Sequence, residues 1–153
     1  GIAYSRNEAK VTLTGIADRP GLAAMVFGPL AGAGVNVDMI VQSASHDGKS
    51  ADITFTVGTA DLERALVVLG GEREGLGFEE VLSDSDVVKV SVIGVGMRTH
   101  AGVARTMFET LSDKGINIQV ISTSEIKISV LIAEEYTELA LRSLHAAYGL
   151  DAD

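Results

Sequence analysis

The sequence is organised around the stretch Gly-Ile-Asn-Ile-Gln-Val-Ile-Ser-Thr-Ser-Glu at residues 115–125. An earlier stretch at residues 34–43, Gly-Val-Asn-Val-Asp-Met-Ile-Val-Gln-Ser, matches it at its glycine, asparagine, isoleucine and serine, each time at the same offset (115 − 34 = 81). Each stretch is typical of a glycine that ends a helix and is followed by a buried strand. The chain is therefore an internal duplication, and we expect two small modules.

Composition excludes several classes of protein. The 153 residues are enough for one ordinary domain or two small ones, and 46% of them are hydrophobic. The chain has no cysteine, which leaves no disulfide framework and no thiolate metal or redox site. Its net charge of −9 argues against nucleic-acid binding, which requires a basic face. No apolar run is long enough to cross a membrane and no signal-peptide pattern opens the chain, so we expect a cytoplasmic protein.

The first copy shows a βαββαβ pattern, which is the ferredoxin-like plan. Its predicted elements are a strand at 10–15, a helix from about 22 to 33, strands at 35–42 and 51–57, a helix from about 59 to 69, a loose glycine-rich connection, and a strand at 78–83. The buried face of the first helix is predicted from its spacing to be Ala23, Phe27, Leu30 and Ala31.

The second copy repeats the pattern but ends before its fourth strand. Its predicted elements are a strand at 88–94, a helix that buries Ala104, Phe108 and Leu111, strands at 116–122 and 126–133, and a helix at 134–148. The strand-like residues 1–6 at the other end of the chain are available to fill the vacant edge. We therefore expect an α+β fold of two modules with antiparallel sheets and helices on one face, the first module (8–85) inserted within the second (86–153 plus strand 1–7).

The sequence contains no convincing catalytic or metal-binding constellation. No phosphate-binding Gly-x-x-x-x-Gly-Lys loop occurs, and Gly94-Val95-Gly96 lacks the third glycine of a dinucleotide fingerprint. The three histidines are far apart and lack ligand spacing. A serine–histidine–glutamate triad can be drawn on paper, but no nucleophile elbow accompanies it. We expect no catalytic residue, metal or cofactor in this chain.

The duplicated loops point to a binding site instead. In each copy a strand leads through a loop, 16–21 or 95–102, into the start of a helix, and the next strand begins near an asparagine. Free N–H groups at a helix start favour a carboxylate. A nearby acid, Asp18, Asp38 or Glu125, can hold an ammonium group, and the two together describe an amino acid. The alternative is that the Asp-x-Pro-Gly turn and the asparagines serve only local backbone structure.

Specific motifs then resemble a known family. Asp18-Arg-Pro-Gly21, followed by Gly-Val-Asn-Val-Asp and Gln42, resembles the ACT domain, a small amino-acid-sensing module. In the second copy, residues 89–97, His100-Ala-Gly102 and above all Ile-Ser-Thr-Ser-Glu-Ile-Lys-Ile-Ser-Val at 121–130 resemble the regulatory region of aspartokinase. The resemblance covers essentially the whole chain and includes no kinase catalytic domain. It implies a small regulatory subunit or an excised regulatory fragment.

The resemblance also implies how the chain works. ACT modules of two chains would associate as a homodimer, bind threonine, lysine or both at their interfaces, and mediate feedback inhibition of aspartate-family amino-acid biosynthesis through the kinase catalytic subunit or domain. The implied effector site comprises Asp18, Gly21, Ala23, Gln42, Asn117 and Ile118. A second effector site or relay is implied at Asn36, Val37, Ser45, Met97, Thr99, His100, Thr123, Ser124 and Glu125.

Other functions remain open. One alternative is a stand-alone ACT amino-acid sensor or partner-binding protein, unconnected to a kinase, and the aspartokinase-like second copy argues against it. A small ferredoxin-like enzyme is disfavoured by the missing acid/base set. An RNA-binding ferredoxin-like domain is disfavoured by the negative charge and by an aromatic content of 5%.

Overall fold

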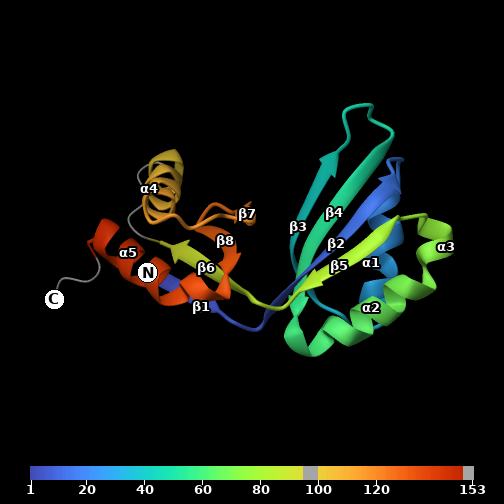
Figure 1. Ribbon diagram of the computed structural model, residues 1–153, viewed down its shortest axis with the longest axis horizontal. Helices are drawn as coiled ribbons and strands as arrows, with labels where there is room; N and C mark the ends of the chain where they lie inside the picture. The colour runs from blue at the N-terminus through green and yellow to red at the C-terminus, as the bar shows by residue number, and fades with distance from the viewer. Residues whose placement is uncertain (95–99, 150–153) are drawn as a thin grey trace. The chain divides into compact units, whose positions relative to one another are not determined.

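The chain folds into two units, each built on its own antiparallel sheet (Figure 1). The computed structural model describes residues 1–94 and 100–149. Unit 1 comprises Gly1–Arg6 and Asp86–Asp153, and unit 2 comprises Asn7–Ser85. The expected α+β class, with two four-stranded ferredoxin-like modules, is confirmed.

Unit 2 carries the complete βαββαβ pattern. Its elements in chain order are β2 (Glu8–Ala17), α1 (Leu22–Gly32), β3 (Val37–Ala44), β4 (Ser50–Gly58), the short 3₁₀ turn η1 (Thr59–Asp61), α2 (Leu62–Gly71), α3 (Arg73–Leu76) and β5 (Glu80–Asp84). The strands lie in the order β3-β4-β2-β5, so β3 and β5 form the edges of the sheet.

Unit 1 reaches the same plan with a strand from the other end of the chain. Its elements are β1 (Ile2–Ser5), β6 (Val87–Ile93), α4 (His100–Asp113), β7 (Val120–Thr123), β8 (Lys127–Ala133), the 3₁₀ turn η2 (Glu134–Tyr136) and α5 (Thr137–Ala147). The order is β1-β6-β8-β7, so β1 occupies the place that β5 takes in unit 2. It runs antiparallel to β6, with Ile2 opposite Val92.

The insertion of unit 2 into unit 1 follows from the pairing of two strands. β2 opens unit 2, β5 closes it, and the two are antiparallel neighbours with Lys10 opposite Asp84. The two ends of the inserted segment therefore leave unit 2 beside each other. Folding of unit 2 thereby brings the chain before residue 7 close to the chain after residue 85, where β1 and β6 pair.

Deletion of residues 1–7 is expected to destabilise unit 1 more than unit 2. The deletion removes β1 and exposes the edge of β6, whereas unit 2 loses only the residue that precedes β2. Hydrogen exchange of the two units in the truncated chain measures the difference. Equal loss of protection in both units, or no loss in either, would contradict the role of β1.

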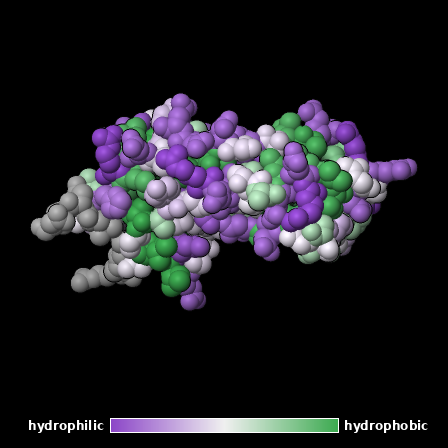
Figure 2. All heavy atoms as spheres, turned by 90° about the horizontal axis from the view of Figure 1, so that it is seen from below, coloured by the Kyte–Doolittle hydropathy of each residue, from purple (hydrophilic) through white to green (hydrophobic). Residues whose placement is uncertain are grey.

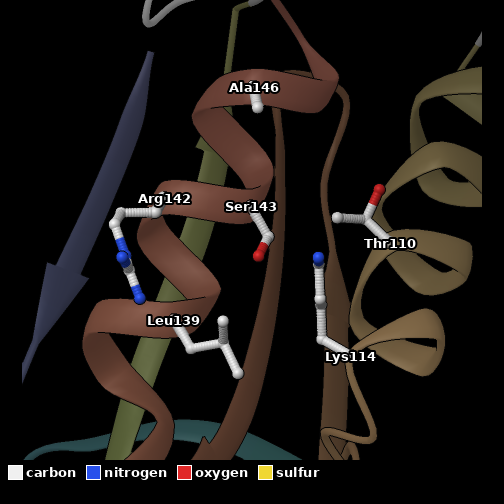
Figure 3. Close-up of a pocket in the computed structure, with 6 residues that line it drawn as sticks. All are labelled: Thr110, Lys114, Leu139, Arg142, Ser143 and Ala146. Atoms are coloured by element: carbon white, nitrogen blue, oxygen red, sulfur yellow. The ribbon is translucent and has the colours of Figure 1, made fainter.

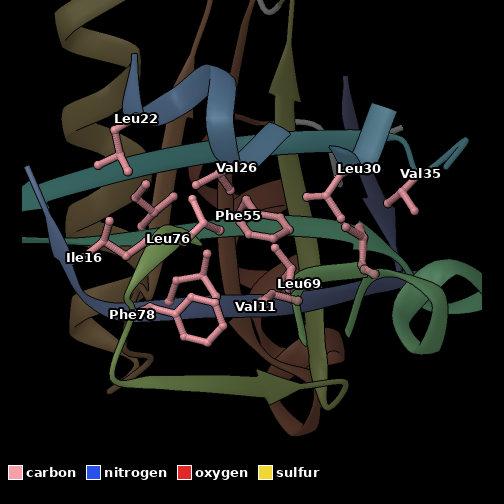
Figure 4. Close-up of a cluster of buried hydrophobic side chains, with 14 of the residues drawn as sticks. Val11, Ile16, Leu22, Val26, Leu30, Val35, Phe55, Leu69, Leu76 and Phe78 are labelled. Atoms are coloured by element: carbon pink, nitrogen blue, oxygen red, sulfur yellow. The ribbon is translucent and has the colours of Figure 1, made fainter. Parts of the chain in front are cut away.

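The core of unit 2 lies between its sheet and α1 and α2 (Figure 4). Phe55 on β4 is fully buried, and its ring meets that of Phe27 edge-on with the centroids 5.3 Å apart. Leu22, Val26 and Leu30 project from one side of α1 into this cluster. Unit 1 has a separate core of its own, built from β6, β8, α4 and α5.

The predicted buried face of α1 was partly wrong. Ala23 and Ala31 are exposed, and the fully buried positions are Leu22, Val26 and Leu30. Apolar residues surround α1 on all sides, so spacing alone does not locate its inner face. Burying a leucine or valine removes more apolar surface from water than burying an alanine, and the helix is turned accordingly.

Three further details differ from the prediction. The buried face of α4 also differs from the prediction. Met107 and Leu111 are buried, whereas Ala104 and Phe108 are only half-buried. Part of the connection predicted as loose forms the helical turn α3. The strand predicted from residue 116 begins only at Val120.

Candidate functional site

The start of α1 forms the first part of the candidate site. Gly21 precedes the helix with φ +86°, a conformation that a side chain disfavours, and no described atom lies within 4 Å of where a Cβ would stand. Among the described residues no side chain caps this helix end. The Leu22 N–H donates to the Arg19 carbonyl and the Met25 N–H to the Gly21 carbonyl. The N–H groups between them, including that of Ala23, face the exposed end of the helix and suit an anion.

Asp18 and Gln42 lie together beside this helix start. Gln42 Nε2 donates to Asp18 Oδ1 at 3.4 Å, and both side chains are exposed. The Asp18 N–H donates to the Lys49 carbonyl at 3.0 Å, which anchors the loop after β2 to the β3–β4 hairpin. The structure thus brings together two predicted side chains that are 24 residues apart in sequence. Their contact is long and solvent-exposed, so a ligand can take its place.

A bulge in β2 positions this loop. The pairing of β2 with β4 shifts between Leu13 and Ile16, and Gly15 lies within the shift at φ +66°. The Gly15 N–H donates to Asp52 Oδ1 at 3.0 Å. Bulges re-aim the residues that follow them. Asp52 therefore supports the loop that carries Asp18, and sequence reasoning had not singled it out.

Asn117 and Ile118 line a cavity of about 400 Å³ in unit 1. Asn117 is exposed and Ile118 is half-buried, and both follow the glycine turn that ends α4. The other lining residues are Phe108, Ser112, Gly115 and Ile116. Ser112 was not predicted. The repeat does distinguish it, because the equivalent position in unit 2 is an alanine, Ala31 (112 − 81 = 31).

Ser45 has a structural role in the β3–β4 hairpin. Its hydroxyl donates to Asp47 Oδ1 and accepts the Ser50 N–H at 3.3 Å. The Lys49 N–H donates to the same carboxylate oxygen at 2.9 Å. These bonds, the one from Ser45 first, hold the pKa of the Asp47 carboxyl below its ordinary value of 3.8.

Replacing Ser45 with alanine is expected to raise the pKa of Asp47 toward 3.8, because the largest bond to the carboxylate is lost. In the wild-type chain the lowered pKa contributes stability that is present above the unfolded-state pKa and is lost as the pH falls through the folded-state pKa. NMR titration of the Asp47 side chain measures the change. An unchanged titration curve would contradict the assigned hydrogen bond.

The remaining predicted residues belong to both units. Asn36 is exposed just before β3, and the half-buried Val37 opens that strand. Thr123 ends β7, and Ser124 and Glu125 form the exposed turn to β8, where the Ser124 N–H donates to the Lys127 carbonyl at 2.8 Å. Met97 and Thr99 lie outside the described residues, as does the side chain of His100, the first residue of α4.

The chemistry of these groups is that of recognition. A carboxylate, an amide and free backbone N–H groups can hold the charged and polar atoms of a small molecule. Within residues 1–94 and 100–149, no cluster of histidine, aspartate and glutamate is arranged to hold a metal ion. None of the described helices is long and apolar enough to cross a membrane.

Comparison with known proteins identifies the family. The ACT domain model matches residues 11–72 and 90–148. The regulatory subunit of aspartate kinase from Thermus thermophilus, solved without ligand, superposes with a TM-score of 0.89 at 39% identity, and the match covers 96% of each chain. The chain belongs to the ACT-domain family, as the regulatory part of an aspartokinase. A crystal structure of aspartokinase alpha and beta subunits also matches this ACT chain, with a TM-score of 0.91, 45% identity and 98% of each chain covered.

Full-length enzymes show the same relationship. An aspartate kinase of Stutzerimonas stutzeri is 54% identical over 152 residues, which is 99% of this chain and 37% of that protein. An aspartokinase of Helicobacter pylori is 47% identical over 99% of this chain and 36% of its own length. The ACT pair thus spans little more than a third of these curated relatives.

Proposed function

We propose that this chain binds an amino-acid effector, threonine, lysine or both, and thereby transmits feedback inhibition to the catalytic part of aspartokinase. The observation that carries the proposal is the contact of Asp18 with Gln42 beside the uncapped start of α1. The match of the chain to aspartokinase subunits of known structure supports the same function.

The proposed binding mode follows from the chemistry of each group. An α-carboxylate suits the N–H groups of the first turn of α1, where Gly21 leaves room for close approach. The Asp18 carboxylate suits the ammonium group, and the Gln42 amide suits a side-chain hydroxyl or amine. Ala23 lies in that first turn and adds no bulk.

Asn117 and Ile118 complete the proposed site from a second copy of the chain. Their cavity of about 400 Å³ exceeds the volume of an amino acid and is open. Backbone groups at these residues would fix the main chain of the effector. An effector held between two copies favours the associated state, and that preference is a regulatory signal.

The energy required is small. Sensing at metabolic concentrations needs a binding free energy of roughly −4 to −8 kcal/mol. Hydrogen bonds to charged groups contribute about 1.5–3 kcal/mol each. Two or three such bonds at Asp18 and the α1 start contribute roughly 3–9 kcal/mol, and burial of the effector between two copies offsets the entropy cost of binding.

The open sheet edges support association of two copies. β3 and β7 are edge strands, and each carries one exposed isoleucine at the same repeat position (121 − 81 = 40). Ile40 is 53% exposed and Ile121 is 45% exposed. An apolar side chain on an unpaired edge favours pairing with another edge. Figure 2 shows hydrophobic side chains gathered in patches among hydrophilic ones on the face in view.

Replacing Ile40 and Ile121 with lysine is expected to shift the chain from dimer to monomer, because each lysine places a charge on a pairing edge. Sedimentation velocity over a range of concentrations measures the shift. Val67→Lys serves as the matched control, since Val67 is 75% exposed and lies on α2, not on an edge strand. Dimerisation that survives the double substitution would contradict an edge-to-edge interface.

Thermal unfolding in the presence of each amino acid tests the proposed function. An effector present at a hundred times its Kd stabilises the folded state by about 2.7 kcal/mol, which corresponds to a rise in Tm of several degrees. We expect this rise with threonine, lysine or the pair, and none with glycine as the control. An unchanged Tm with every one of them would contradict the proposal.

A further inference from the structure

A second recess in unit 1 lies between α4 and α5 and plays no part in the proposed effector site. Its volume is about 450 Å³. Leu139 and Ala146 on α5 give it an apolar floor, and Thr110 on α4 lies across from Ser143 (Figure 3). We call this recess the α4–α5 groove.

Two cations line the groove. Lys114 follows the end of α4, and its amine points toward the Ser143 hydroxyl on α5, while Arg142 extends along the other flank of α5 (Figure 3). Within the described part of the chain, neither cation has an ion pair or hydrogen bond, and no acidic side chain lines the groove. The whole chain carries 21 acidic and only 12 basic residues, so an acid-free site with two cations departs from its general surface.

The other repeat shows that the fold does not require these cations. The counterpart of Lys114 is Ala33 (114 − 81 = 33), and the helices α5 and α2 correspond at an offset of 75 (137 − 62 = 75), which matches Arg142 with Val67 and Ser143 with Val68. The polar character of the α4–α5 groove is therefore specific to unit 1.

The shape of the groove indicates the class of ligand. It is open and runs along two helices, whereas sites for small molecules bury most of their ligand. An apolar floor flanked by cations suits a peptide segment that carries a carboxylate beside apolar side chains.

The weak binding expected of such a groove indicates where the peptide comes from. Exposed charge pairs contribute at most about 1 kcal/mol each, too little to hold a free partner. A segment of the same enzyme needs far less affinity, because its effective concentration is in the millimolar range. The aspartate kinase of Stutzerimonas stutzeri, of which this chain spans 37%, has such a further portion.

We propose that the α4–α5 groove receives an acidic, partly apolar segment of the kinase portion of aspartokinase, with Lys114 and Arg142 contacting its carboxylates. The inference rests on the proposed function only in assigning the chain to that enzyme. It does not depend on the identity of the effector or on effector binding.

Lysine labelling tests this docking site. The amines are acetylated with an N-hydroxysuccinimide ester in the intact enzyme and in this chain alone, and the rates are measured by mass spectrometry. We expect Lys114 to react at least about fivefold more slowly in the intact enzyme, and the protection to disappear in 1 M salt, where the Debye length is about 3 Å. Lys49, exposed in the β3–β4 hairpin, is the control and should react equally in both samples.

Carbodiimide cross-linking then identifies the segment. The reagent joins a lysine amine to a carboxylate in direct contact, and we expect Lys114 to be joined to an aspartate or glutamate of the kinase portion. In Lys114→Arg this cross-link should be lost, while the charge that supports docking is retained. Equal reactivity of Lys114 in both samples would overturn the proposal. Protection that already exists in the isolated chain and grows with its concentration would overturn it in favour of a second copy.

An enzyme whose Tm is unchanged by threonine and lysine, but whose Lys114 is protected and cross-linked, would contradict the proposed effector binding and leave the docking site standing. The proposed effector binding and the proposed docking site can therefore be contradicted independently of each other.

Discussion

Replacing Asp18 with asparagine is expected to weaken effector binding roughly 10- to 150-fold. The substitution keeps the size of the side chain and removes its charge, so the ammonium group of the effector loses a charge-assisted hydrogen bond of about 1.5–3 kcal/mol. The fold should be unaffected, because the carboxylate is exposed and its described contact is a long one, 3.4 Å, to Gln42. Calorimetric titration of the variant measures the loss.

Glu63→Gln is the matched control for this variant. It likewise replaces an exposed carboxylate with an amide, on α2, which carries no predicted effector residue. We expect the control to bind the effector as the wild-type chain does. Equal affinity of Asp18→Asn and the wild-type chain would mean that Asp18 is only a turn residue, which is the alternative that its sequence left open.

Replacing Phe55 with alanine is expected to destabilise both units, although Phe55 belongs to unit 2 alone. The lost ring is fully buried and packs edge-on against Phe27, so the direct cost to unit 2 is about 3–5 kcal/mol. That is comparable to the whole stability of a small domain. Once unit 2 unfolds, β1 and β6 of unit 1 are joined by a flexible loop of about 80 residues, whose closure costs about 4 kcal/mol.

Leu111→Ala should destabilise unit 1 and leave unit 2 folded. Leu111 is fully buried in the core of unit 1, and its truncation costs that unit about 2–5 kcal/mol. Unit 2 is a continuous segment, Asn7–Ser85, and does not need unit 1 to close its sheet. Hydrogen exchange resolved by peptide separates the two units. Loss of protection confined to unit 2 in Phe55→Ala would contradict the coupling through chain connectivity.

The duplication made most of the fold predictable. The repeat at an offset of 81 residues identified equivalent strands and helices in the two copies, whatever the secondary-structure propensity of each residue. The missing fourth strand of the second copy then indicated that residues 1–6 fill its place. The face of α1 was not predictable in this way, because Leu22 through Phe27 are all apolar and offer no polar side to orient the helix. The glycines around α3 likewise disguised a helical turn that Leu76 anchors by burial.

The candidate site was less accessible from sequence. The proximity of Asp18 and Gln42 depends on the bulge at Gly15 and on the hairpin that holds the Asp18 backbone, neither of which a local pattern reveals. Ser45 stays a predicted effector-site or relay residue, and its hydroxyl in addition closes the turn of the β3–β4 hairpin, which the sequence did not indicate. Phe108 and Ser112 line the Asn117 cavity from α4, and no motif in the sequence singled them out as site residues.

Isothermal titration calorimetry of the wild-type chain, with threonine and lysine added singly and then together, tests amino-acid binding most directly. We predict a saturable heat for at least one of them, with a Kd between about 1 μM and 1 mM, and a binding isotherm that is strongly weakened in Asp18→Asn. The absence of any binding heat with either amino acid or with both, at every temperature tried, would contradict the account.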